Sequence, residues 1–288
     1  MKAPAFAYRR PQTLDDVFAL MREHGSEAKL LAGGQTLLAT LNMRLSEPAM
    51  LIDIARVEAL KGIAVVDDVL RIGALVTHRE IEESPLVATH APLLAMAAPH
   101  IAHRAIRNRG TWGGSIAFAD PSAEWPVCLV ALEGTVIVRS AAGERRIPAG
   151  DFFVDLYTTA LRDDELVTGC EIPVATAADW FGFDELARRH GDYAIVGLAV
   201  AATFDGDRVG RLRMAFLGMG TTPVRATTAE AALEGRALSG ELIEAAVDHL
   251  KTELDPMGDL TNTADTKRHL ATVLGRRLLH AAAKEGAS

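Results

Sequence analysis

The stretch LAGGQTLLAT, residues 31–40, places two adjacent glycines at the end of an apolar run and follows them with a hydroxyl-bearing residue. TWGGSIAFADPSAEWP, residues 111–126, repeats the arrangement. Glycine lacks Cβ, so a ligand can approach its main chain and successive N–H groups can converge on an anion. A helix that begins directly after such a turn adds further unpaired N–H groups. The two stretches together suit two facing nests of amides that fit a pyrophosphate, although a single glycine pair is more typical of a plain turn or a helix start without a ligand.

Neither glycine pair belongs to a common nucleotide-binding motif. No Gly-Lys-Ser/Thr follows either pair, as a Walker loop requires, and neither has the G-x-G-x-x-G spacing of the dinucleotide fingerprint. ATP and a Rossmann-bound cofactor are therefore poor candidates.

Composition narrows the class of protein further. The 288 residues are 49% hydrophobic and 24% charged, which is enough for a substantial core in one composite domain or in two to three small ones. The formal charge is −8 and the basic residues form no run longer than a pair, so no nucleic-acid partner is expected. The start of the chain has no apolar signal region and no stretch is apolar enough to span a bilayer, so we expect a cytoplasmic protein without a transmembrane segment.

The chain has two cysteines, Cys128 and Cys170. Two distant thiols are too few to hold iron–sulfur clusters or structural zinc. The sequence therefore predicts no metal site on this chain, and any metal chemistry belongs to another chain.

The periodicity of apolar residues changes along the sequence. A helix is predicted from residue 14, with Thr13 as its cap and Gly25 as its stop, and a buried strand at 28–33 enters the first glycine pair. Residues 63–75 read as a hairpin that turns at Asp67-Asp68, TVIVRS (135–140) as a strand that enters a turn at Ala141-Gly143, and 166–173 as a strand. After a shift in composition near 176–180, long antiparallel runs joined by the turn at 205–207 lead into C-terminal helices.

Five motifs together resemble those of a known family. They are AGGQT (32–36), GALVTHREIE (73–82), IRNRGTWGGSIAFADPSAEWP (106–126), ELVTGCEIP (165–173) and ARRHGDYAIVGLAVA (187–201). In this order they resemble the FAD-carrying medium subunits of molybdenum hydroxylases, over essentially the whole chain. That family includes medium chains of carbon monoxide dehydrogenase, FAD subunits of nicotine and quinoline oxidoreductases, and the FAD domain of xanthine dehydrogenase.

The resemblance implies an α+β fold. Residues 1–176 are expected to form a two-subdomain FAD-binding region of the vanillyl-alcohol-oxidase type, with subdomains at about 1–57 and 58–176. Residues 177–288 are expected to form a C-terminal domain in which a three-stranded antiparallel sheet packs against helices.

The resemblance also implies a function as an oxidoreductase subunit. A large partner subunit carries molybdopterin and hydroxylates the substrate, a small partner subunit carries 2Fe–2S clusters, and this chain's FAD passes the electrons to an external acceptor. A dimer of such heterotrimers is the expected assembly. The favoured substrates of the holoenzyme are N-heterocycles, purines or aldehydes, with a carbon monoxide dehydrogenase medium chain as the alternative.

The same resemblance assigns cofactor-binding residues and no catalytic residue. The first loop is expected to bind the pyrophosphate, the second loop to complete that site, Asp120 and Glu124 to accept hydrogen bonds from sugar or ribityl hydroxyls, and Tyr193 to lie against the isoalloxazine ring. The full expected set is Ala32, Gly33, Gly34, Gln35, Thr36, Leu37, His78, Thr111, Gly113, Gly114, Ser115, Asp120, Glu124, Val167 and Tyr193.

Several positions depart from the family pattern. Many relatives carry Asn at position 115 and His or Asn at position 118, where this chain has Ser115 and Phe118, and some carry a lysine near Asp184 and Glu185. Trp112 is expected to pack rather than to do chemistry. The basic segment His100, His103, Arg104 and Arg107 reads either as a solvated helix face or as a docking surface for the iron–sulfur subunit. A cofactor-free scaffold and a free-standing flavin oxidase with this fold both stay open at this point.

Overall fold

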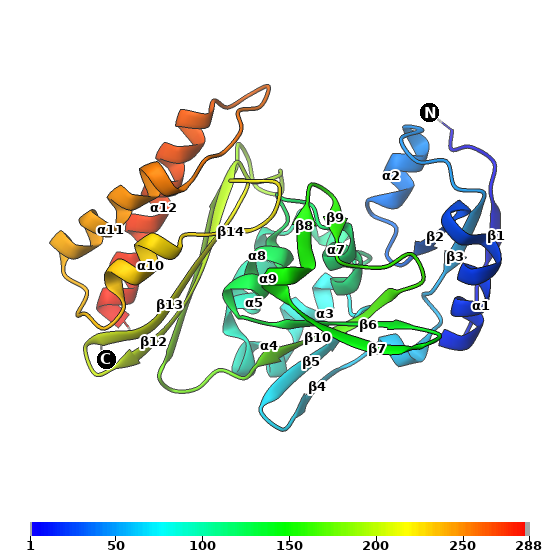
Figure 1. Cartoon of the computed structure of the whole chain (residues 1–288), viewed down its shortest axis with the longest axis horizontal. Coiled ribbons are helices and arrows are strands. Elements are labelled where there is room, and N and C mark those ends of the chain that lie inside the picture. The colour runs from blue at the N-terminus through cyan, green and yellow to red at the C-terminus, as the bar shows by residue number, and fades with distance from the viewer. Residues whose placement is uncertain (1, 286–288) are drawn as a thin grey trace.

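The computed structural model describes residues 2–285, and the chain extends along one axis in three parts (Figure 1). The N-terminal part has a parallel sheet in the order β1-β3-β2, built from β1 (Ala7–Arg9), β2 (Ala28–Leu31) and β3 (Met50–Asp53). Helix α1 (Leu14–His24) buries Val17 and Phe18 against this sheet. The predicted cap is confirmed, since Thr13 Oγ1 accepts the Asp16 N–H at 3.2 Å. The strand β2 runs into the first glycine pair, and α2 (Leu37–Asn42) follows it.

The central part is built on a five-stranded antiparallel sheet in the order β4-β5-β10-β6-β7. Its strands are β4 (Ile63–Val66), β5 (Val69–Gly73), β6 (Thr135–Ser140), β7 (Gly143–Pro148) and β10 (Leu166–Pro173). The predicted hairpin at 63–75, the predicted strand and turn at 135–143 and the predicted strand at 166–173 are confirmed. A two-stranded hairpin, β8 (Phe153–Asp155) with β9 (Thr158–Thr159), stands beside the helix α7 (Trp112–Phe118) (Figure 1).

Short helices carry the chain between these strands. They are α3 (His78–Glu83), α4 (Pro85–His90), α5 (Pro92–Ala97), α6 (Arg104–Arg107), α7 (Trp112–Phe118), α8 (Glu124–Ala131) and α9 (Ala149–Phe152). Helix α8 is buried along its length and supplies much of the central core, together with Trp112 of α7. Trp112 is fully buried against Trp125, with ring centroids 5.3 Å apart, so its expected packing role is confirmed.

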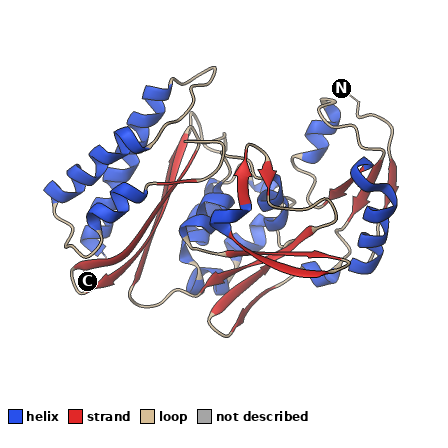
Figure 2. Ribbon diagram, in the orientation of Figure 1, coloured by secondary structure: helices blue, strands red, loops and turns tan. Residues whose placement is uncertain are grey.

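The C-terminal part is a sheet in the order β11-β12-β13-β14 with helices on one face (Figure 2). The three long strands are the predicted ones, β11 (Asp179–Leu186), β12 (Val196–Asp205) and β13 (Arg208–Leu217). A two-residue strand, β14 (Val224–Arg225), is added at the edge and is too short to leave a pattern in the sequence. Helices α10 (Thr227–Leu233), α11 (Gly240–Glu253) and α12 (Ala264–Glu285) enclose a separate core with this sheet.

The other face of this sheet packs on the central part. Ala199, Ala215 and Leu217 belong to the same buried cluster as α5 and α8. Within residues 2–285, no helix is long and apolar enough to cross a membrane.

Arg107 corrects the interpretation of the basic segment. Its side chain is buried, and its guanidinium donates to the carbonyls of Ile101 and Ala102 at 3.0 and 3.2 Å and binds both oxygens of Glu82. Arg104, by contrast, is exposed and pairs with Glu83. Arg107 is therefore neither a solvated nor a docking residue, because it fixes the turn that leads into the second glycine loop.

We expect Arg107→Met to lower the free energy of unfolding by about 3 kcal/mol, because it leaves Glu82 and buried carbonyls without their donor. Arg104→Met, three residues away, is the control and should change it by less than about 0.5 kcal/mol. Urea unfolding followed by tryptophan fluorescence measures both. Equal effects of the two variants would contradict the structural role of Arg107.

Candidate cofactor-binding site

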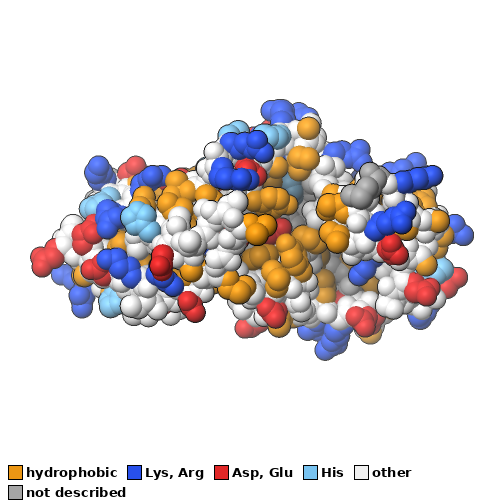
Figure 3. All heavy atoms as spheres, turned by 90° about the horizontal axis from the view of Figure 1, so that it is seen from above, with side chains coloured by type: hydrophobic (Ala, Val, Ile, Leu, Met, Phe, Trp, Pro, Cys, Tyr) orange, Lys and Arg blue, Asp and Glu red, His pale blue; other side chains and the backbone are white. Residues whose placement is uncertain are grey.

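A cleft of about 860 Å³ opens between the N-terminal and central parts. Viewed from above, apolar side chains gather around the hollow (Figure 3). Its walls come from the β2–α2 loop, from α7 and the start of α8, from β10, and from the segment that holds Tyr193. A volume of this order suits a large organic ligand.

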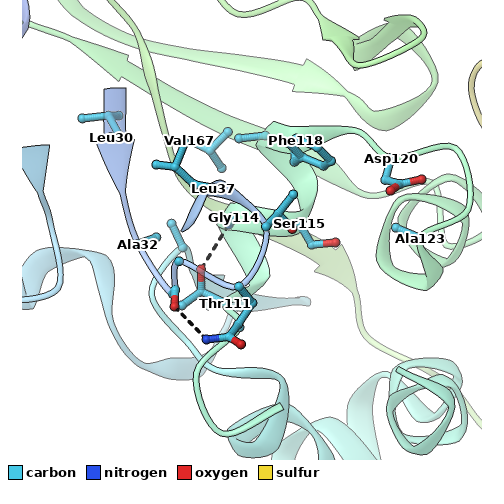
Figure 4. Close-up of a pocket in the computed structure, with 18 of the residues that line it drawn as sticks. Leu30, Ala32, Leu37, Thr111, Gly114, Ser115, Phe118, Asp120, Ala123 and Val167 are labelled. Atoms are coloured by element: carbon cyan, nitrogen blue, oxygen red, sulfur yellow. Dashed lines mark hydrogen bonds between the residues drawn. The ribbon is translucent and has the colours of Figure 1, made fainter. Parts of the chain in front are cut away.

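The structure brings every residue of the predicted cofactor set to this one cleft. The lining includes Ala32, Gly33, Gly34, Gln35, Thr36, Leu37, His78, Thr111, Gly113, Gly114, Ser115, Asp120, Glu124, Val167 and Tyr193. In the close-up, Ala32 and Leu37 of the first loop lie beside Thr111 and Gly114, while Asp120 and Ala123 lie at the opposite end (Figure 4). Which of these residues touch a cofactor stays a prediction.

The first glycine loop presents unpaired amides. Within residues 2–285, the backbone N–H groups of residues 33–36 donate to no protein acceptor. Gly34 has a φ of +74°, which favours glycine, and a Cβ on Gly33 would lie 2.1 Å from the Arg109 carbonyl oxygen. The loop therefore packs directly on the segment that leads into the second loop while its amides stay available.

The second glycine loop differs from its prediction. Trp112 N–H donates to the Val76 carbonyl at 2.8 Å, Gly113 N–H donates to the Ala74 carbonyl at 2.9 Å, and Gly114 N–H donates to Thr111 Oγ1 at 3.2 Å. The prediction of a second nest of free amides is therefore wrong. Gly113 is required by packing, because a Cβ there would lie 2.4 Å from Ala74 Cβ. The loop offers instead the exposed face of Gly114 and the hydroxyl of Ser115.

His78 is a buried residue of the cleft wall. It begins α3 behind the capping box formed by Thr77 and Glu80, and its Nδ1 accepts the Trp125 indole N–H at 2.9 Å. Burial lowers the pKa of His78 to about 4, and the charge of Arg107 contributes to the same shift. The ring is therefore neutral at pH 7 with its proton assigned to Nε2, beside Gly110, where it can donate to an occupant of the cleft.

Two acids and a tyrosine occupy the opposite end. Burial raises the pKa of Asp120, and burial together with the negative charge of Glu185 raises the pKa of Glu124 to about 8. Glu124 is thus protonated at neutral pH, so it can donate a hydrogen bond as well as accept the predicted ones. Tyr193 is exposed at the cleft, and partial desolvation of its hydroxyl together with the charge of Asp120 raises the pKa of that hydroxyl.

The sequence analysis missed other residues of the cleft wall. Lys29, on β2, carries the one permanent positive charge among the described residues that line the cleft. The feature of the sequence that could have identified Lys29 is its position four residues before the first glycine pair. Tyr157, in the hairpin β8–β9, packs on Phe118 with ring centroids 5.0 Å apart, and no motif in the sequence marks it.

Asp184 and Glu185, near which some relatives carry a lysine, have different surroundings. Asp184 pairs with Arg277 of α12, so it belongs to the contact between the C-terminal sheet and its helices. Glu185 lies on the other side of β11, where its side chain is 6% exposed and near His100. Of these two acids, it is therefore the charge of Glu185, and not that of Asp184, that bears on the cleft.

An open cleft with free amides, a lysine and polar groups at both ends suits a large anionic cofactor. Two family models match the chain: the FAD binding domain in molybdopterin dehydrogenase over residues 4–175, and the CO dehydrogenase flavoprotein C-terminal domain over residues 181–282. The chain belongs to the family of FAD-binding medium subunits of molybdenum hydroxylases, which confirms the resemblance read from the sequence.

Relatives match over nearly their whole length. The chain is 40% identical to the nicotine 6-hydroxylase medium subunit of Paenarthrobacter nicotinovorans, covering 97% of this chain and 98% of that protein. Among solved structures, carbon monoxide dehydrogenase from Hydrogenophaga pseudoflava matches with a TM-score of 0.95 and 37% identity, covering 98% of both chains. Quinoline 2-oxidoreductase from Pseudomonas putida 86 matches with a TM-score of 0.95 and 35% identity, covering 100% of both chains.

The neutral state of His78 makes stability depend on pH. Below the ordinary histidine pKa of 6.5, His78 binds a proton in the unfolded chain, but in the folded chain it binds that proton only near pH 4. The free energy of unfolding therefore falls as the pH falls from 6.5 to 4. We expect the protonation of His78 to lower the free energy of unfolding by about 2–3 kcal/mol at pH 4. His78→Gln should flatten this part of the profile in urea unfolding. An NMR titration that shows His78 protonating near pH 6.5 would contradict the assignment.

Proposed function

We propose that this chain carries FAD in the described cleft, takes electrons from 2Fe–2S clusters of a partner subunit and passes them to an external acceptor. The observation that supports it most directly is the set of free amides at residues 33–36, in a loop that lines a cleft large enough for the cofactor. Membership of the FAD-binding family supplies the identity of the cofactor.

The residues present fit FAD. The amides of Gly33 to Thr36 and the ammonium of Lys29 supply donors and positive charge for a diphosphate. Ser115 and Thr111 add hydroxyls, while Leu37 and Val167 add apolar surface. His78 Nε2–H and the protonated Glu124 supply donors for the remaining polar atoms of the cofactor, and the exposed ring of Tyr193 can stack on its flavin. FAD bound here would supply two-electron chemistry, and the protein would supply position and hydrogen bonds.

The domain limits belong to the same proposal. We propose an FAD-binding region at 1–176, with subdomains at 1–57 and 58–176, followed by a C-terminal domain at 177–288. The three separate buried clusters support this division, because each lies largely within one of the three parts.

The substrate that we propose for the complex is inferred from the relatives rather than from this chain. A nicotine 6-hydroxylase subunit and a quinoline 2-oxidoreductase are among the relatives, so an N-heterocycle is favoured, with purine or aldehyde next. Carbon monoxide stays the alternative, since a carbon monoxide dehydrogenase medium chain is 35% identical over 98% of both proteins.

Replacing Gly34 tests the FAD site. We expect Gly34→Val to purify with at least about tenfold less flavin, because the side chain forces the left-handed turn to change and disperses its amides. Gly206→Val is the matched control: Gly206 also has positive φ, at +60°, but lies in the β12–β13 turn with open space around it. Visible flavin absorbance relative to protein absorbance is the measurement. If the wild-type chain takes up no FAD, the FAD proposal is overturned and the cofactor-free scaffold is the interpretation that remains.

We propose a cytoplasmic assembly in which two copies of this chain join two small and two large subunits. Co-expression with the neighbouring reading frames should yield a particle whose mass in light scattering equals twice the sum of three chains. A particle with one copy of each chain would contradict the dimer of heterotrimers and leave the FAD assignment untouched.

A further inference from the structure

The hairpin β8–β9 holds an aromatic residue in an unfavourable backbone conformation. Tyr157, at the turn, has a φ of +52°, and within residues 2–285 it is the only aromatic residue with a positive φ. The left-handed region suits glycine, and a bulky side chain occupies it only where the surrounding structure holds it there. Strained residues of this kind cluster at binding sites, so the position of the Tyr157 side chain calls for a functional explanation.

A hydrogen bond and two buried rings hold the hairpin in this shape. Directly before Tyr157, the Leu156 N–H donates to Asp155 Oδ1 at 2.8 Å. At the base of the hairpin, Phe152 and Phe153 are buried, and their rings pack edge-on with centroids 5.2 Å apart. The hairpin is therefore anchored in the core of the central part and forms a firm support for the Tyr157 ring.

The Tyr157 ring lies at the cleft and not in the core. Tyr157 lines the cleft and is 53% exposed, so burial of the ring does not explain why this residue occupies the turn. The ring packs on Phe118 of α7, with centroids 5.0 Å apart and ring planes inclined by 51°. Phe118 also lines the cleft, two residues before Asp120 (Figure 4). The contact with Phe118 therefore places Tyr157 at the end of the cleft where Asp120 lies.

Tyr193 is a second exposed tyrosine of the same cleft. Of the three tyrosines in the chain, Tyr157 and Tyr193 both line it. They come from distant parts of the chain, one from the β8–β9 hairpin and the other from the connection between β11 and β12. An exposed tyrosine offers a large, rigid and flat surface that suits stacking against a planar ring. A cleft lined by two such rings therefore suits a ligand that has a flat aromatic part.

We propose that Tyr157 is a second aromatic contact of the flavin ring, beside Tyr193, and that the strained turn of β8–β9 serves to direct the phenol ring toward the cofactor. The proposal rests on the FAD site proposed above and adds a residue from a hairpin that carries none of the predicted cofactor-binding residues. The flavin, and not the adenine, is assigned to this end of the cleft because Tyr193 is the predicted flavin contact. The diphosphate then lies toward the first glycine loop.

Tyr157→Gly separates cofactor binding from folding. Glycine removes the ring but fits the left-handed turn, so relief of strain offsets the lost packing on Phe118, and the thermal midpoint of the FAD-free chain should change little. The same variant should bind FAD about tenfold more weakly, because a stacking contact with the flavin is lost. Calorimetric titration of the FAD-free chain with FAD measures the affinity, and scanning calorimetry measures the midpoint. An FAD affinity equal to that of the wild type would overturn the proposal.

Tyr157→Phe tests the contact with the flavin directly. This variant keeps the ring, the turn and the packing on Phe118, but a phenyl ring cannot quench an excited flavin by electron donation as a phenol in contact with it does. With Tyr193→Phe as the common background, we expect a longer fluorescence lifetime of the bound flavin when Tyr157 is also replaced by Phe. Tyr8→Phe in the same background is the control, because Tyr8 bonds to Asp53 and is not among the described residues that line the cleft. It should leave the lifetime unchanged.

The outcomes separate the two proposals. Weaker FAD binding in Tyr157→Gly together with a longer flavin lifetime in Tyr157→Phe supports the contact, even where the glycine variant is less stable. If the wild-type chain binds FAD but Tyr157→Phe leaves the flavin lifetime unchanged, the ring supports the cleft wall without touching the flavin, and the contact alone is overturned. A wild-type chain that binds no FAD overturns the proposed function and the contact with it.

Discussion

The contact between the Gly33 backbone and the Arg109 carbonyl is the constraint on which the cleft depends. No side chain fits there, since a Cβ on Gly33 would lie 2.1 Å from that oxygen. The contact joins the loop after β2 to the segment before α7, and so joins the N-terminal and central parts at the point where the cleft opens. The buried guanidinium of Arg107 fixes this segment by donating hydrogen bonds to the carbonyls of Ile101 and Ala102. Glycine in the first loop thus has two functions: it permits the docking and it leaves the amides bare.

The two glycine loops look alike in sequence but have different surroundings. The amides of the second loop bond to the carbonyls of Ala74 and Val76, which follow β5, so this loop is part of the framework. The first loop lies at the edge of its sheet, and no strand end reaches its amides. A diphosphate would therefore depend on the first loop for N–H donors and on the second for shape and for hydroxyls. Unequal roles of this kind cannot be read from the motifs, since both contain the same residue types.

Local pattern predicted the local structure well. Caps, hairpins and strands such as Thr13, the turn at Asp67-Asp68 and 166–173 follow from the spacing of nearby residues, and the structure confirms them. The resemblance also named residues that come together at one cleft. What the sequence could not show are relations between distant residues: the burial of Arg107 against Glu82, the engagement of the second loop's amides, and the effect of the Glu185 charge on the pKa of Glu124. Each depends on packing between elements, which leaves no periodic signal.

The charges of the cleft wall explain how an acidic protein can hold an anionic cofactor. Beside Lys29, the described lining contains five acids, which are Asp120, Glu124, Asp163, Glu165 and Asp192. Three of them are compensated: Glu165 binds Arg145, Asp192 pairs with Arg188, and Glu124 keeps its proton at neutral pH. The remaining negative charge includes Asp120, which lies at the end opposite the first glycine loop (Figure 4). A diphosphate at the bare amides would then lie at the other end of the cleft from Asp120, and Glu124, when protonated, adds no negative charge to the acidic end.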